Sequence, residues 1–301
     1  MHDDPPHPDD ETAADRARVA AIVASAAYRP AARDTDLLAR NELRGVRIAL
    51  DYEKTELLLV QHGVAHAIVV FGSARIREPD TAARNLELAR AAERDHPGDA
   101  PRAAAARTAE RLVAHSVRYD DARAFGRLVG ASQPRTGHDR VVIMTGGGPG
   151  IMAAANRGAN DVGAQSIGLN IMLPHEQTPN PYVSPELCVS FHYFAMRKLH
   201  FVRRARALVA FPGGFGTIDE IFETLTLIQT GKMAPVPVVL IDRRFWERAI
   251  DIDFLVAEGM LSPRDRDLFH FAESAADAWR YIRDWHARAG TPNFPLPDAA
   301  K

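Results

Sequence analysis

The chain has 301 residues, of which 46% are hydrophobic and 25% are charged, a balance typical of a globular protein with a sizeable core. Its 37 Lys and Arg residues stand against 39 Asp and Glu residues, and this net charge of −2 argues against a protein built to neutralise nucleic-acid phosphates. The single cysteine, Cys188, excludes an intramolecular disulfide framework, and the absence of a long apolar run predicts no membrane span.

The first residues, MHDDPPHPDDET, are acidic and proline-rich, so we expect a tail without a secretory signal and a cytoplasmic location. The next fifty residues carry apolar side chains at helical spacing, for example Val19, Ile22 and Val23. We therefore predict four segments, namely a disordered tail (1–12), a helical N-terminal extension (13–63), one α/β domain (64–290) and a C-terminal tail (291–301).

Short apolar runs rich in β-branched residues follow, several of them separated by helical patterns. They read AIVVFG, VVIMTGGG, QSIGLNI, LCVSFHY, ALVAFPGG and VPVVLID. Continuous apolar runs indicate strands that are buried on both faces, which predicts a Rossmann-like, doubly wound and mainly parallel sheet. Two helical patterns occupy the long connection between Arg77 and Arg140. Ligands of such sheets bind where the carboxyl ends of the strands meet, and here glycine clusters follow several strands.

The first of the clusters that we single out, GGGPGIM, follows a strand and opens a helix. Gly147 and Gly148 would let the backbone approach a phosphate or a ribose. The dinucleotide fingerprint would require glycine where Ile151 stands, and no Walker motif occurs in the chain. A tight turn without any ligand explains the glycines equally well.

The second cluster, PGGFGTIDE, is more informative. Glycines at positions 213, 214 and 216 precede Thr217, which is expected to open an amphipathic helix. Backbone amides, the hydroxyl group of Thr217 and the helix dipole would then converge on a bound phosphate. Thr217 and Glu220 also have the spacing of a capping box, in which Glu220 would only satisfy a backbone amide. We favour a ligand loop, because a cap does not need three glycines before it.

Two further segments carry polar candidates. The helical pattern YFAMRKLHFVRRA places Arg197 and Lys198 about 100° apart, so they cannot share one face, and either a phosphate contact or an exposed basic face fits them. The proline-rich LPHEQTPNPY contains Glu176 and Asn180, which suit recognition of a base or a sugar as well as turn formation. The histidines have no spacing typical of a metal site.

GGGPGIM, the Arg197–Lys198 pair and PGGFGTIDE occur in this order, and together they resemble the Lonely Guy (LOG) family over about residues 66–245. Members of that family cleave the N-glycosidic bond of nucleoside 5′-monophosphates to a free base and ribose 5-phosphate. Many have been labelled lysine decarboxylases, although this sequence shows no context for a pyridoxal-phosphate lysine. The helical extension and the long connection are similar to the larger bacterial branch, which favours a purine nucleotide such as AMP over a cytokinin riboside monophosphate.

The resemblance implies that Arg197 and Glu220 are catalytic and that the 5′-phosphate binds at Gly214 to Thr217. It also implies a Rossmann-like LOG-type catalytic domain, a homodimer or higher homo-oligomer, and no cofactor, metal, nucleic acid or membrane partner. Substrate contacts are expected at Gly147, Gly148, Glu176, Lys198, Gly213, Gly214, Phe215, Gly216, Thr217, Ile218, Asp219 and Thr226.

The expected chemistry agrees with these residue types. Cleavage of a ribosyl C1′–N bond builds positive charge on the sugar, and a carboxylate such as Glu220 stabilises that charge and orients or deprotonates water. The alternative is a binding or carrier protein for a nucleotide or a molybdenum cofactor on the same scaffold, without turnover. The pair Arg197 and Glu220 distinguishes the two, because a pure binder needs no carboxylate at the ribose.

Overall fold

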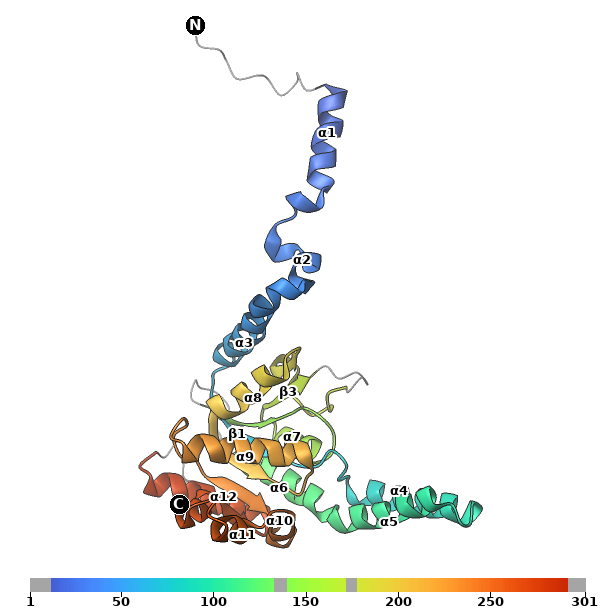
Figure 1. Cartoon of the computed structure of the whole chain (residues 1–301), viewed down its shortest axis with the longest axis vertical. Coiled ribbons are helices and arrows are strands. Elements are labelled where there is room, and N and C mark those ends of the chain that lie inside the picture. Colours follow the sequence, from blue (N-terminus) through green and yellow to red (C-terminus); the bar gives the residue numbers. More distant parts are fainter. Residues whose placement is uncertain (1–11, 133–139, 172–177, 292–301) are drawn as a thin grey trace. The chain divides into compact units, whose positions relative to one another are not determined.

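A computed structural model describes residues 12–132, 140–171 and 178–291 of the chain. The chain separates into two compact units, Met1–Tyr52 and Glu53–Lys301 (Figure 1). Apart from Thr12 and Thr291, the two predicted tails lie outside the described residues. Among the helices that the structure describes, none is long and apolar enough to cross a membrane.

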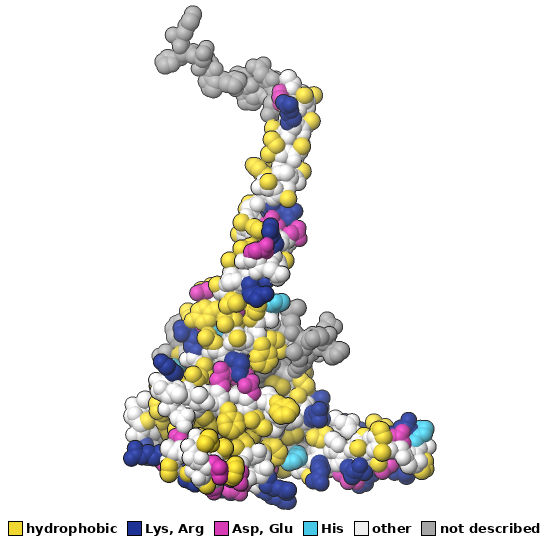
Figure 2. Space-filling view, viewed as in Figure 1, with side chains coloured by type: hydrophobic (Ala, Val, Ile, Leu, Met, Phe, Trp, Pro, Cys, Tyr) yellow, Lys and Arg dark blue, Asp and Glu magenta, His cyan; other side chains and the backbone are white. Residues whose placement is uncertain are grey.

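The first unit consists of short helices that follow the predicted periodicity. Thr12 caps the first helix by accepting a hydrogen bond from the amide of Asp15. No side chain between residues 12 and 52 is buried, and Val19, Ile22 and Val23 are about half exposed. Figure 2 shows hydrophobic side chains on the surface along these helices. The elements are α1 (Ala13–Ala24), α2 (Thr35–Ala39), the start of α3 (Arg44–Gln61), and 3₁₀ turns at Ala26–Tyr28, Ala31–Arg33 and Asn41–Leu43.

The second unit is built on a seven-stranded parallel sheet, which confirms the predicted Rossmann-like, doubly wound fold class. The strand order is β4-β3-β2-β1-β5-β6-β7, so the chain builds outward from β1 in one direction and then returns to its other side. Such a reversal leaves a crevice at the carboxyl ends of the strands beside it. The strands are β1 (Val64–Phe71), β2 (Arg140–Thr145), β3 (Ser166–Ile171), β4 (Cys188–Phe191), β5 (Ala205–Ala210), β6 (Val238–Ile241) and β7 (His270–Ala272).

Each face of this sheet carries its own apolar core. In β1, Ile68 and Val70 join the core formed with α6, α7 and α12, whereas Val69 and Phe71 join the core on the other face. This alternation explains why the strands appear as continuous apolar runs. The second face is covered by α8 (Phe194–Arg203), α9 (Phe215–Gln229), α10 (Arg243–Ala249) and the end of α3, and the first by α6 (Val117–Ala131), α7 (Ile151–Asp161) and α12 (Ala275–Arg288).

The long connection from β1 to β2 contains one helix more than we predicted. α4 (Pro79–Asp95) and α5 (Ala100–His115) lie side by side and bury only Ala82 and Ala106 (Figure 1). The additional helix, α6, packs on α7 and belongs to the core. The other elements of this unit that we did not predict are the short β7, the helices α10, α11 (Ile252–Ala257) and α12, and 3₁₀ turns at Pro185–Leu187 and Pro263–Leu268.

Candidate functional site

A cavity of about 290 Å³ lies where the carboxyl ends of β1, β2 and β5 meet, at the position where the strand order reverses. It brings together Arg197, Glu220 and the glycine-rich loop after β5. The lining residues are Phe71, Gly72, Ser73, Ala74, Arg75, Gly146, Met152, Arg197, Phe201, Gly214, Phe215, Gly216, Thr217 and Glu220.

The loop after β5 runs directly into α9, which begins at Phe215, two residues before the predicted start. The helix is capped at Gly214 without any side-chain hydrogen bond, so the capping box between Thr217 and Glu220 is not formed. The amides of Thr217 and Ile218 both donate to the carbonyl oxygen of Gly214 at 3.0 Å. The amides of Gly214, Phe215 and Gly216 precede Thr217, the first residue that donates to Gly214 inside the helix. They are the donors that the start of a helix offers to an anion.

Packing requires glycine at only one of the three glycine positions of this loop. A Cβ atom on Gly213 would lie 2.2 Å from Oγ1 of Thr217, which is buried beneath it. A Cβ atom on Gly214 or Gly216 would meet nothing within 4 Å. Gly213 therefore permits the close approach of loop and helix, while the other two glycines leave the space in front of the helix open.

Arg197 extends from α8 into the cavity without an acidic partner. Its Nε atom is buried and has no hydrogen-bond partner among the residues that the structure describes, and no ion pair with its guanidinium is found there. The group stacks 4.3 Å from the ring centre of Phe194 and 5.7 Å from that of Phe201. Burial lowers the pKa of Arg197, although nearby Glu220 and Asp219 oppose this change. A buried cation without an acceptor is costly, so this site favours an anionic ligand.

Glu220 lies one turn into α9 and is only 4% exposed. Burial raises the pKa of its carboxyl group to about 7, and the neighbouring Glu223 and Asp219 act in the same direction, while Lys198 and Arg197 oppose them. A carboxyl group with a pKa near neutrality can both accept and release a proton at physiological pH.

Lys198 does not line this cavity. Its Nζ atom lies 2.9 Å from Oδ2 of Asp219 and 2.9 Å from Oε2 of Glu223, so it fastens α8 to α9. Burial would lower the pKa of Lys198, but these two hydrogen bonds raise it. Of the other predicted contacts on α9, Ile218, Asp219 and Thr226 do not line the cavity.

The loop after β2 contributes Gly146 rather than the predicted Gly147 and Gly148. The amide of Gly147 donates to Oγ1 of Thr145, and the carbonyl groups of Gly147 and Gly148 each accept a 3.0 Å hydrogen bond from Nδ2 of Asn180. Asn180 therefore holds this loop in place, which is the turn-forming role that the sequence left open. Glu176 lies outside the described residues.

Ser73, Arg75, Met152 and Phe201 also line the cavity, although we did not select them from the sequence. A signal for Ser73 was present, because Gly72 and Ser73 follow a strand as the other glycine clusters do. Within residues 12–132, 140–171 and 178–291, no group of three or more His, Cys, Asp or Glu side chains could hold a metal ion.

Comparisons with known proteins point to one family. A family model described as "Possible lysine decarboxylase" matches residues 152–282. The cytokinin riboside 5′-monophosphate phosphoribohydrolase LOG3 of Arabidopsis thaliana is 27% identical over 156 residues, which cover 50% of this chain and 71% of that protein. The probable cytokinin riboside 5′-monophosphate phosphoribohydrolase LOGL5 of Oryza sativa subsp. japonica is 30% identical over 139 residues, covering 45% of this chain and 55% of that protein.

Solved structures are similar at lower identity. The structural-genomics target TM1055 aligns with a TM-score of 0.45 at 21% identity, covering 73% of this chain and 99% of the other. The Moco carrier protein from Chlamydomonas reinhardtii aligns with a TM-score of 0.40 at 23% identity, covering 57% of this chain and 89% of the other.

Proposed function

We propose that the chain, which is similar to proteins of the Lonely Guy (LOG) family, is a nucleoside 5′-monophosphate phosphoribohydrolase that acts on purine nucleotides such as AMP. The reaction releases the free base and ribose 5-phosphate. The observation that carries this proposal is the placement of Arg197, which lacks an acidic partner, and buried Glu220 in one cavity behind a glycine-rich helix start.

The phosphate of the substrate would bind at the start of α9. Amides of Gly214, Phe215 and Gly216 offer donors there, and the helix dipole adds a favourable field. Arg197 supplies the charge that neutralises the anion, since its guanidinium has no competing carboxylate bond. Arg75, in the loop after β1, lines the same cavity and adds a second cation. Binding of the phosphate fixes the ribose that is attached to it. The binding energy of the phosphate, which does not react, thereby helps to position the anomeric carbon for the reaction.

Glu220 would act at the anomeric carbon. The electron pair of the C1′–N bond leaves with the base, which takes up a proton, and the oxygen of a water molecule forms the new bond to C1′. Glu220 accepts the proton that this water loses, and its carboxylate stabilises the positive charge on the sugar during bond cleavage. A pKa of about 7 keeps a substantial carboxylate fraction at neutral pH and lets the group return the proton afterwards.

The test is incubation of the purified chain with AMP and a panel of purine and pyrimidine monophosphates, followed by chromatography for free base. We expect free base and an equal amount of ribose 5-phosphate from at least one purine nucleotide. Release of no base from any monophosphate of the panel would falsify the proposal.

Glu220→Gln provides the matched variant, because it keeps the size and the hydrogen-bonding capacity of the side chain. We expect turnover to fall by about 10²- to 10⁴-fold while nucleotide binding, measured by calorimetry, persists. Unchanged turnover would remove Glu220 from the mechanism. Binding without any turnover in the unmodified chain would instead indicate a nucleotide carrier.

A further inference from the structure

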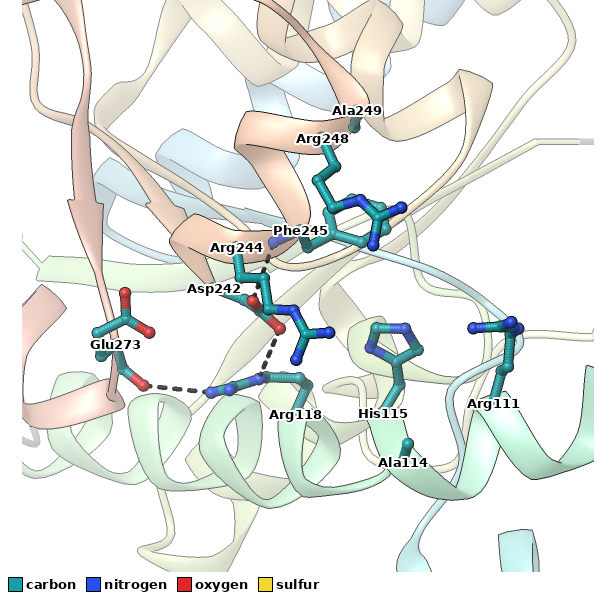
Figure 3. Close-up of a pocket in the computed structure, with 10 residues that line it drawn as sticks. All are labelled: Arg111, Ala114, His115, Arg118, Asp242, Arg244, Phe245, Arg248, Ala249 and Glu273. Carbon is teal, nitrogen blue, oxygen red and sulfur yellow. Dashed lines mark hydrogen bonds and ion pairs between the residues drawn. The ribbon is translucent and has the colours of Figure 1, made fainter.

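A second and larger cavity, of about 790 Å³, lies at the carboxyl ends of β6 and β7, on the same edge of the sheet as the first (Figure 3). One wall comes from the end of α5 and the start of α6, within the long connection, and the other from α10. The lining residues are Arg111, Ala114, His115, Arg118, Asp242, Arg244, Phe245, Arg248, Ala249 and Glu273. None of them lines the cavity that holds Glu220.

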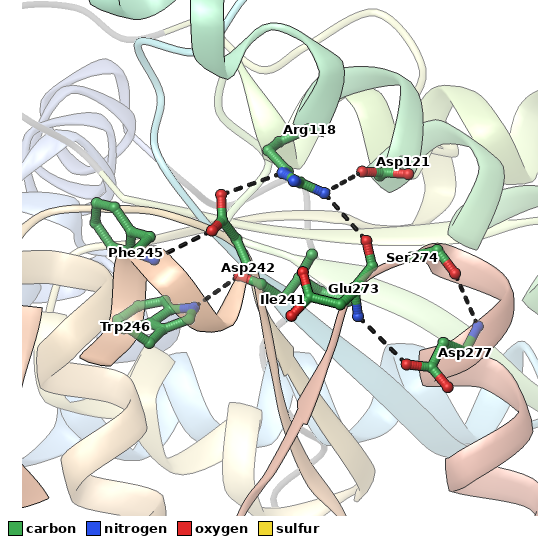
Figure 4. A network of polar contacts seen from close by, with 9 residues as sticks. All are labelled: Arg118, Asp121, Ile241, Asp242, Phe245, Trp246, Glu273, Ser274 and Asp277. Carbon is green, nitrogen blue, oxygen red and sulfur yellow. Dashed lines mark hydrogen bonds and ion pairs between the residues drawn. The ribbon is translucent and has the colours of Figure 1, made fainter. Parts of the chain in front are cut away.

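Arg118 is firmly held by its neighbours. Its Nη1 atom lies 2.7 Å from Oδ2 of Asp121 and donates to the carbonyl oxygen of Glu273 at 3.2 Å, while its Nε atom lies 3.3 Å from Oδ2 of Asp242 (Figure 4). The other carboxylate oxygen of Asp242 accepts a hydrogen bond from the amide of Phe245. The carboxylates of Asp121 and Asp242 are thus already committed, and Arg118 forms a fixed part of the wall, which also includes Glu273.

The other three arginines are not committed in this way. No hydrogen bond or ion pair joins Arg111, Arg244 or Arg248 to an acceptor in the part of the chain that the structure describes. Figure 3 shows Arg244 and Arg248 extending from α10 toward the space beside His115, with Arg111 on the opposite wall. Guanidinium groups gathered around one cavity repel each other, and a ligand with several negative charges would remove that repulsion.

We propose that this cavity binds a small anion that carries two or more phosphate groups, such as an inorganic oligophosphate or a nucleoside triphosphate. Three arginines that can each make a two-pronged contact with phosphate oxygens exceed what one phosphate group can use. The volume is within the range of small-molecule sites and exceeds that of the cavity at Glu220. A concave site in a chain of net charge −2 favours a small anion over a nucleic-acid strand.

The test is isothermal titration calorimetry of the full chain with orthophosphate, tripolyphosphate, ATP and a short single-stranded DNA. We expect tripolyphosphate or ATP to bind more tightly than orthophosphate, and more weakly as salt rises. Whichever of tripolyphosphate and ATP binds more tightly shows whether the cavity takes an inorganic oligophosphate or a nucleoside triphosphate. No binding of either, equal binding of orthophosphate, or tightest binding of the DNA would each overturn the proposal.

Paired variants locate the binding. Arg244→Ala combined with Arg248→Ala should weaken tripolyphosphate binding by about 100-fold, since removing each guanidinium from the phosphate corresponds to roughly a factor of ten in affinity. Arg94→Ala combined with Arg264→Ala removes the same charge from positions that do not line the cavity, and should change affinity by less than about threefold. Arg197→Ala should retain the binding. An equal loss of affinity in both double variants, or a loss in Arg197→Ala, contradicts the assignment.

Discussion

Arg197 and Lys198, which are neighbours in the chain, direct their charges to different places. The guanidinium of Arg197 lies in the cavity with Glu220 and has no acidic partner among the described residues, whereas the ammonium of Lys198 lies 2.9 Å from Asp219 and from Glu223. One turn of α8 thus provides both a cation for a ligand and a link between α8 and α9.

Arg197→Met should remove activity without reducing stability. The buried guanidinium has no partner to lose, so an apolar side chain of similar length should leave the free energy of unfolding unchanged or raise it by about 1 kcal/mol. Arg204→Met is the matched control. Arg204 donates to Glu56 at 2.8 Å and to the carbonyl oxygen of Val64 at 2.9 Å, and its loss should cost about 2–4 kcal/mol. Urea denaturation and base release together check both variants, and marked destabilisation by Arg197→Met would contradict the prediction.

The pKa of Glu220 predicts how stability depends on pH. Because the pKa is raised to about 7 in the folded chain from an ordinary value of 4.5, the folded state binds more protons than the unfolded state between these pH values. The unfolding free energy should therefore fall as pH rises from about 4.5 to 7, by roughly 3 kcal/mol at most. Glu220→Gln lacks this group, and the difference between the two denaturation profiles isolates its effect. A constant difference across this interval would show that the pKa is not raised.

Two glycines of the loop after β5 should respond differently to the same substitution. Gly213→Ala places a methyl group 2.2 Å from Oγ1 of Thr217, so the loop and the start of α9 must shift. We expect a loss of about 1–3 kcal/mol in stability and a strong loss of turnover. Gly216→Ala meets no atom within 4 Å and should raise stability by about 0.5–1 kcal/mol, because alanine favours the helix. Thermal unfolding of the two variants compares them directly, and similar losses would refute the packing argument.

Asn180→Ala tests how the loop after β2 is held. The variant removes the side-chain donor to the carbonyl groups of Gly147 and Gly148, and one of the two side-chain donors to the amide oxygen of buried Asn156. We expect a loss of about 2–4 kcal/mol and a raised KM for the nucleotide. Gln229→Ala removes one exposed hydrogen bond, to Asp265, and should change stability by less than about 0.5 kcal/mol. If both variants behave alike in chemical denaturation, Asn180 does not organise the loop.

The fold was largely predictable because its signals are local. Six apolar runs identified six of the seven strands, and only β7, which has three residues, was too short to be recognised. α6 was missed because its periodicity continues almost without interruption from that of α5. The sheet order is set by packing between distant segments, which no short pattern records.

The candidate site was predictable where glycine marks a strand end, and less so elsewhere. Arg197, Glu220 and Gly214 to Thr217 line one cavity, and the sequence brought Arg197 to this site only through the resemblance to the LOG family. Lys198 and Thr226 look equally suitable in the sequence, but the helical rotation of α8 and α9 takes them out of the cavity lining. Arg75 was overlooked because an isolated arginine after a strand has no distinctive pattern.

The pair of helices α4 and α5 buries only two alanines, yet the end of α5 supplies Arg111 and His115 to the larger cavity. This division means that specificity for an anion could be exchanged by transplanting a hairpin of helices, with little penalty to the hydrophobic layers beneath. The hairpin is thus the place to engineer a new anion sensor without changing Arg197 or Glu220 in the other cavity.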